Sequence, residues 1–302
     1  MVRQTIIFLL VTGMLPLYGQ TSPPLNNVGK DKEIKTGFCD LGNGSLYYEE
    51  CGQGPPLILI HAGALDCRMW DQQFVEFAAQ YRVIRYDTRN HGKSRTEIVQ
   101  YSHPDDLARL MDSLHIGRAI LVGLSMGGYI AIDFALKYPA RVNALITVSS
   151  GITGYNFRDP QILEYNAKLK TAETYEEAVE YILRQWCDGP FRTPDQVDSL
   201  VRNKVKNMYS DFFQNFQRGL KENRSDPPAI GRLAEIKKPI LTIVGDLDQP
   251  GILEIAAMIE KQVPGTQKSV IKGAAHMVNL EKPDEFNATV LKFLRSFEPL
   301  NN

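Results

Sequence analysis

The sequence has few cysteines, no block of charge of one sign and no apolar run long enough to span a membrane. Its 302 residues include 34 basic and 35 acidic side chains, mixed along the chain, for a formal net charge of −1. The lack of a basic block argues against a nucleic-acid partner, and the lack of an acidic tail argues against disorder. The four cysteines do not have the spacing of a zinc site, and a chain of this size needs no disulfide staples. We therefore expect no metal and packed free thiols, with one disulfide as the alternative, at Cys39, Cys51, Cys67 and Cys187.

The amino terminus differs in composition from the rest of the chain. Arg3 precedes 13 mostly apolar residues, TIIFLLVTGMLPL, and a polar, proline-containing stretch, YGQTSPPLNN, follows them. This order is typical of a secretory signal peptide, and 13 residues fall short of the roughly 20 that a membrane span requires. A buried first helix is the alternative, but Gly13 and Pro16 disfavour it. We expect a signal peptide over 1–20, a linker over 21–35, export to the periplasm or medium, and no stable membrane span.

The remaining chain alternates predicted strands and helices. A hairpin centred on Asn43-Gly44 comes first, followed by continuous apolar runs that are typical of strands covered on both faces. Strands are predicted at 55–63, 81–87, 118–125, 142–150, 238–246 and 267–273, and helices at 69–79, 103–116, 129–138, 251–262 and 283–297. Residues 152–235 have helical spacing and no clear strand. This order predicts an α/β fold, with a mostly parallel central sheet, helices on both faces and the hairpin at one edge. The core is then divided into 36–151 and 236–302 by a helical insert over 152–235.

The segment GLSMGG, residues 123–128, places a serine at the point where a buried strand passes into a helix. The pattern G-x-S-x-G in that context is typical of a sharp turn that exposes a nucleophilic Ser125. Gly123 and Gly127 allow the strand and the helix to approach closely. The backbone N–H of Met126 starts the helix, where an anion is stabilised. The alternative is a glycine-rich turn in which the serine only caps the helix.

A serine nucleophile needs a base and a carboxylate that orients the base. His276, in GAAHMVNLEKPDEF, follows the last predicted strand and is the best base. Of the other histidines, His103 and His115 flank an expected surface helix, and His61 and His91 lie in loops that look structural. Two acids in IVGDLDQP compete for the third role. Both follow a strand's carboxyl end, and we favour Asp248, with Asp246 as a turn or capping residue.

These motifs together resemble the α/β-hydrolases of the esterase, lactonase and carbon–carbon hydrolase group. The likeness runs from about residue 38 to 297 and rests on LILIHAGALDCRMW, YRVIRYDTRNHGKS, GLSMGG, VGDLDQP and GAAHMVNLEKPDEF. The resemblance supports Asp248 as the acid. It also implies that the backbone N–H of Gly63, in the loop that begins His61-Ala62, is the second oxyanion donor beside that of Met126. The helical insert corresponds to the family's lid.

The resemblance and the motifs predict a serine hydrolase that acts on small-molecule carboxylic esters or lactones without a cofactor. Hydrolysis of carbon–carbon bonds in ring-fission-type diketones on the same triad is the alternative. A ligand-binding protein on a hydrolase scaffold is the alternative from another class. Leu65, Trp186 and Phe212 are expected to line the substrate pocket, although aromatic residues of the insert are first of all packing residues. The sequence leaves the oligomeric state open.

Overall fold

The structure, a computed structural model, describes residues 33–297. The signal peptide predicted over 1–20 lies outside the described residues, as does most of the predicted linker. Between residues 33 and 297, no helix combines the length and the apolar composition that crossing a bilayer requires.

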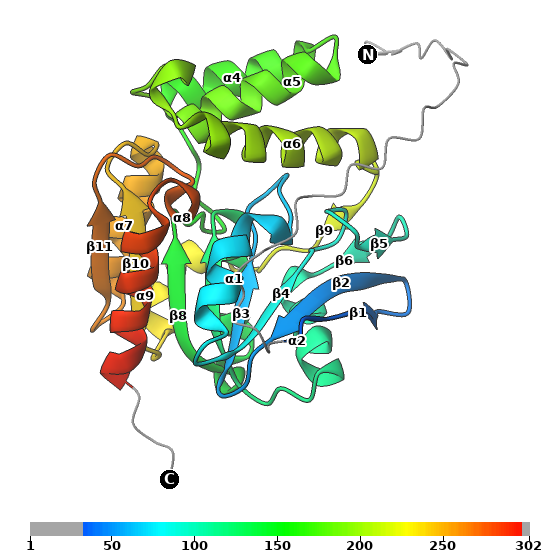
Figure 1. Ribbon diagram of the computed structural model, residues 1–302, viewed down its shortest axis with the longest axis vertical. Coiled ribbons are helices and arrows are strands. Elements are labelled where there is room, and N and C mark those ends of the chain that lie inside the picture. The colour runs from blue at the N-terminus through cyan, green and yellow to red at the C-terminus, as the bar shows by residue number, and fades with distance from the viewer. Residues whose placement is uncertain (1–32, 298–302) are drawn as a thin grey trace. The chain divides into compact units, whose positions relative to one another are not determined.

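Continuous apolar runs form the core of a nine-stranded sheet in the described chain (Figure 1). The strands follow the order β1-β2-β4-β3-β7-β8-β10-β11, and β5 pairs with β2. The hairpin β1-β2 is antiparallel and forms one edge, β2 pairs antiparallel with β4, and all pairs from β4 to β11 are parallel. The mostly parallel sheet with an edge hairpin is therefore confirmed. The strands are β1 (Lys35–Asp40), β2 (Gly44–Cys51), β3 (Pro56–Ile60), β4 (Arg82–Tyr86), β5 (Arg95–Thr96), β7 (Ala119–Leu124), β8 (Val142–Val148), β10 (Ile240–Gly245) and β11 (Gln267–Ile271).

Helices cover both faces of this sheet, as predicted. Along β7, Ile120 and Val122 pack on one face, and Leu121 packs on the other. The first face is covered by α1 and α9 and the second by α2, α3 and α7. A strand buried on both faces has no polar side to alternate with its apolar side, which explains the unbroken apolar runs in the sequence. The helices of the core are α1 (Asp71–Phe77), α2 (His103–Ser113), α3 (Met126–Lys137), α7 (Pro250–Gln262), α8 (Val278–Glu281) and α9 (Pro283–Phe297).

The insert between β8 and β10 contains α4 (Pro160–Thr171), α5 (Tyr175–Ile182), a π-helix (Leu183–Asp188) and α6 (Ser199–Asn215). Figure 1 shows α4, α5 and α6 together beyond the end of the sheet toward which β8 points. The expectation of no strand here was wrong in one detail. Residues Lys221–Glu222 form β9, which pairs in parallel with β6 (Gln100–Tyr101). A strand of two residues is too short to produce an alternating pattern in the sequence.

Two further details differ from the expectations. Helix α3 begins at Met126, three residues before the predicted start, because Gly127 and Gly128 hide the helical pattern there. The predicted surface helix α2 is buried on one face, and its first residue, His103, is only 3% exposed. The cysteines pack as expected: Cys39, Cys67 and Cys187 are buried free thiols, and Cys51 is buried as well.

Candidate active site

Ser125 occupies a strained turn between β7 and α3. Its φ is 54°, a left-handed conformation that a residue with a side chain rarely adopts. The flanking glycines allow this turn, as predicted. A Cβ on Gly123 would lie 2.1 Å from the carbonyl oxygen of Gly127, and a Cβ on Gly127 would lie 2.1 Å from that of Ile60. Backbone atoms on both sides therefore leave no space for any larger residue.

His276 and Asp248 form a buried pair at the carboxyl end of the sheet. Asp248 follows β10, His276 follows β11, and their exposed fractions are 1% and 2%. Nδ1 of His276 lies 3.0 Å from each carboxylate oxygen of Asp248. Because a carboxylate accepts hydrogen bonds, Nδ1 carries the proton, and Nε2 is left with a lone pair that can accept one. Asp248 Oδ1 also accepts the backbone N–H of Gln249 at 2.7 Å, which fixes the carboxylate in its plane.

The competing acid, Asp246, lies in a different environment. Its Oδ1 accepts the backbone N–H of Gly273 at 2.7 Å, and its Oδ2 lies 3.6 Å from Nζ of the exposed Lys272. The structure thus places Asp248 against the imidazole of His276 and places Asp246 in a turn between the ends of β10 and β11.

Ser125, His276, Gly63 and Met126 all line one cavity of about 380 Å³. Gly63 and Met126 are adjacent across it: the Cβ position of Gly63 lies 3.7 Å from Cβ of Met126. Neither backbone N–H donates a hydrogen bond to any group in the described part of the chain. Met126 is also the first residue of α3, so its N–H lies at the positive end of the helix dipole. Two unoccupied donors beside a serine can stabilise an oxyanion.

The cavity walls are mostly aromatic and aliphatic, and they differ in part from the prediction. Trp186 lines the cavity, and its ring centroid lies 4.6 Å from that of His276. Leu65 and Phe212 do not line it. Leu65 is buried in the core, and α6 directs Phe212 against His91 rather than toward Ser125. The other large side chains of the wall were not predicted from the sequence; they are Tyr129, Ile152, Tyr155, Phe157, Ile182, Tyr209, Arg224, Ile252 and Met277.

Tyr129 could have been found from the sequence, because it lies one helical turn after Ser125 on α3 and so faces the same side. The other wall residues come from the insert, from the loop after β11 and, for Ile252, from the first turn of α7. No periodic pattern in the sequence says which of their faces meets the cavity.

The π-helix that carries Trp186 is fastened to both loops of the His–Asp pair. Nε2 of Gln249, the residue after Asp248, donates to the carbonyl of Gln185 at 2.7 Å. Arg192 donates to the carbonyls of Cys187 and Asp188 in the π-helix and pairs with Glu281 at 2.5 Å. Glu281 in turn accepts the backbone N–H of Ala275, the residue before His276. Trp186 is therefore held over the imidazole by the same loops that hold the pair. A π-helix at such a position is a frequent feature of functional sites.

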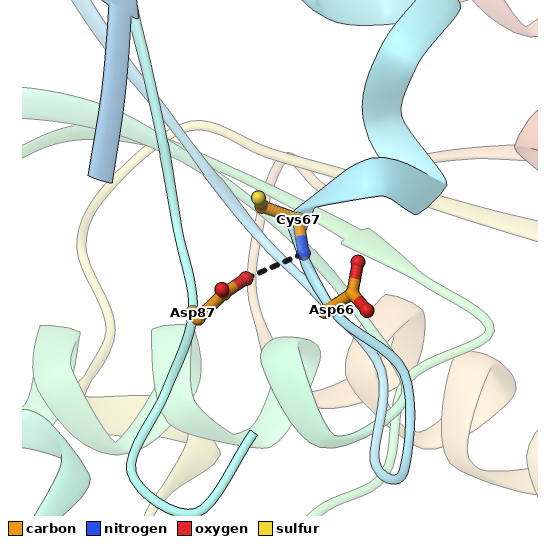
Figure 2. Close-up of side chains that lie close together, drawn as sticks. All are labelled: Asp66, Cys67 and Asp87. Carbon is orange, nitrogen blue, oxygen red and sulfur yellow. Dashed lines mark hydrogen bonds between the residues drawn. The ribbon is translucent and has the colours of Figure 1, made fainter. Parts of the chain in front are cut away.

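One group of three side chains in residues 33–297 is close enough to share a metal ion, namely Asp66, Cys67 and Asp87 (Figure 2). Their surroundings do not fit one. Asp87 accepts the backbone N–H groups of Cys67 and Lys93 at 2.8 and 2.7 Å, and both oxygens of Asp66 bind Arg68. Burial, with Asp87 nearby, raises the pKa of the Cys67 thiol well above its usual value, whereas a metal ligand must be a thiolate. The cluster anchors the chain that follows Gly63.

This arrangement agrees with the comparisons with known proteins. The family model described as alpha/beta hydrolase fold matches residues 55–283. The chain belongs to the α/β-hydrolase family. It is 31% identical over 286 residues to the 2-hydroxy-6-oxononadienedioate/2-hydroxy-6-oxononatrienedioate hydrolase of Burkholderia vietnamiensis, across 91% of this chain and 96% of that one.

Solved structures of this hydrolase fold are also similar. A thermophilic esterase from Thermogutta terrifontis superposes with a TM-score of 0.70 at 26% identity, over 87% of this chain and 98% of that one. Est816, described as an N-acyl homoserine lactone degrading enzyme, superposes with a TM-score of 0.68 at 26% identity, over 87% of this chain and all of that one. The protein is thus an enzyme of the hydrolase class.

Proposed function

We propose that this hydrolase cleaves carboxylic esters or lactones through an acyl-enzyme on Ser125. The observation that carries the proposal is the meeting, in one cavity, of a serine in a strained turn, His276 paired with the buried Asp248 behind it, and two unoccupied backbone N–H donors. A ligand-binding protein has no need of that combination. The walls favour a medium-sized, largely apolar acyl or ring-containing substrate.

In the first half of the reaction, Ser125 Oγ attacks the carbonyl carbon while its proton passes to Nε2 of His276. Asp248 stabilises the imidazolium, and the N–H groups of Gly63 and Met126 donate to the oxyanion. The tetrahedral intermediate then expels the alkoxide, which takes the proton from His276. In the second half, water loses a proton to His276 and attacks the acyl carbon. The carboxylic acid leaves, and Ser125 regains its proton.

A second candidate is hydrolysis of the carbon–carbon bond of a ring-fission-type diketone on the same residues. The relative from Burkholderia vietnamiensis, which is 31% identical over almost its whole length, supports it. The two activities differ in the bond that breaks, so substrates distinguish them directly.

The test is a screen of p-nitrophenyl esters of graded acyl length, lactones and vinylogous diketones, with Ser125→Ala as the matched control. We expect turnover of esters or lactones that falls about 10⁴-fold or more in the variant. A fluorophosphonate should label wild type at Ser125 alone. Cleavage of the diketone without ester turnover would replace the first candidate by the second. Labelling at another residue, or full activity of Ser125→Ala, would refute both.

We further propose that residues 152–235 act as a lid and that the protein is exported after removal of residues 1–20. The position of Trp186 over His276 supports the lid, because strand-end loops alone would leave Ser125 open to water. The signal-like composition supports export. Amino-terminal sequencing of the protein from its native host should find a start near residues 19–21. A start at Met1 or Val2 would refute export.

A further inference from the structure

Two histidines that the proposed reaction does not use border the loop that carries Gly63. Nδ1 of His61 lies 2.7 Å from the carbonyl oxygen of Ala62, and its Nε2 lies 2.9 Å from the backbone nitrogen of Thr88. Nδ1 of His91 lies 2.7 Å from the carbonyl oxygen of Arg89, and its Nε2 lies 3.1 Å from the backbone nitrogen of Ala64. A carbonyl can only accept and a backbone N–H can only donate. Both rings are therefore neutral, with the proton on Nδ1 and a lone pair on Nε2.

These contacts act on the two peptide groups on either side of Gly63. The carbonyl of Ala62 and the N–H of Gly63 belong to one planar trans peptide and so point in opposite directions. His61 and the N–H of Leu65 both bind that carbonyl. His91 binds the N–H of the next peptide, between Gly63 and Ala64. Ala64 has a φ of 59°, so the chain holds an unfavourable conformation at the point where His91 binds it.

We propose that His91 is a positioning residue for the oxyanion donor: its Nε2 fixes the Gly63–Ala64 peptide so that the N–H of Gly63 points into the cavity. This inference rests on the proposed function, since an oxyanion must form there. His91 itself does not line the cavity, so it acts through the backbone and not on the substrate.

The insert holds the ring of His91 in place. Phe212 of α6 stacks on it with a centroid distance of 4.9 Å and an interplanar angle of 29°. The neighbouring Asn90 exchanges two hydrogen bonds, each 2.9 Å, with the backbone of Gln217, which follows α6. Burial, with His61 nearby, lowers the pKa of His91 to about 3, so the ring stays neutral and able to accept at neutral pH. The proposed lid and the oxyanion donor are thus joined by one side chain.

The test compares two substitutions, each of which can retain one of the two backbone hydrogen bonds that the imidazole of His91 makes. In His91→Asn, the amide nitrogen can replace Nδ1 as the donor to Arg89, but the acceptor for Ala64 is lost. In His91→Gln, the amide oxygen can reach the position of Nε2 and accept from Ala64. His115→Asn is the control, because His115 is exposed just after α2, does not line the cavity, and has a φ of 55° that suits asparagine. All rates are taken per active site, counted by fluorophosphonate labelling.

We expect His91→Asn to lower kcat for the best ester about tenfold to hundredfold, a fraction of what losing an oxyanion donor costs, with KM within about twofold of wild type. Affinity for a trifluoromethyl ketone, which forms an oxyanion with Ser125, should fall by the same factor. His91→Gln should recover most of the kcat and most of the inhibitor affinity, and His115→Asn should change neither quantity.

The inference is refuted if kcat of His91→Asn per active site equals that of wild type, or if its KM rises while kcat is unchanged. It is also refuted if kcat of His91→Gln is no higher than that of His91→Asn. Each of these comparisons applies only if the wild-type protein hydrolyses esters and is labelled at Ser125. A wild type that does neither refutes the proposed function instead, so the two failures are distinguishable.

Discussion

Replacement of Asp248 by asparagine should disable His276 by changing its tautomer rather than its position. The N–H of Gln249 binds Oδ1 of Asp248 at 2.7 Å, so the amide oxygen of an asparagine keeps that place. Its NH₂ group then takes the place of Oδ2, which lies 3.0 Å from Nδ1 of His276. Oδ1 also lies 3.0 Å from Nδ1, but a proton on Nδ1 would face the NH₂ donor at the same distance. The tautomer with its proton on Nε2 is therefore favoured, because its Nδ1 accepts from the NH₂ group. An imidazole protonated at Nε2 cannot accept the proton of Ser125.

The expected loss in kcat is about 10⁴-fold, or about 5.5 kcal/mol in the transition state, as in a serine protease that carries this change. Asp246→Asn is the matched control two residues away. An asparagine oxygen can still accept the N–H of Gly273, so we expect a loss of less than about tenfold. The assay is steady-state hydrolysis of the best p-nitrophenyl ester at neutral pH. If Asp246→Asn is the inactive variant and Asp248→Asn stays within tenfold of wild type, the acid has been assigned to the wrong residue.

Three further predictions concern the pocket, the turn and the buried histidines. Trp186→Leu should lower kcat about tenfold and shift the preferred acyl length in the ester series, whereas Trp186→Phe should keep both; an unchanged acyl profile in Trp186→Leu would contradict the proposed lid. Gly127→Ala should lower the free energy of unfolding in urea by at least about 3 kcal/mol, because its Cβ meets backbone 2.1 Å away; Gly117→Ala, which has open space, should stay within about 0.5 kcal/mol, and equal losses would disprove the steric argument. Burial lowers the pKa values of His61, His91 and His103 below the 6.5 of an exposed histidine, that of His91 to about 3. Below about pH 6.5 the unfolded chain therefore binds more protons than the folded one, and stability should fall by up to about 1.4 kcal/mol per pH unit for each histidine. Urea unfolding at pH 7 and pH 5 measures this loss, which His91→Gln should reduce; an equal loss in that variant would show that His91 is not among the groups responsible.

The sequence by itself determined the layers of the fold and the turn at Ser125. Both follow from local physical requirements. A strand buried on two faces needs an unbroken apolar run, and the close approach of β7, α3 and β3 leaves space only for glycine at Gly123 and Gly127. Short-range patterns of this kind are present in the order of the residues.

Only the tertiary structure decided which distant side chains meet. Asp246 and Asp248 are equivalent as residues that follow a strand, and only the path of the loop after β11 puts His276 against the second of them. A helical stripe says that one face of α6 is apolar but not what that face contacts, so Phe212 was expected in the pocket and lies on His91 instead. The hydrogen bond from Gln249 to the π-helix that carries Trp186, and the hydrogen bond from the N–H of Ala64 to His91, likewise join segments that are separated in the chain. Contacts of that range depend on how packed elements are placed in space, and no spacing along the sequence encodes that placement.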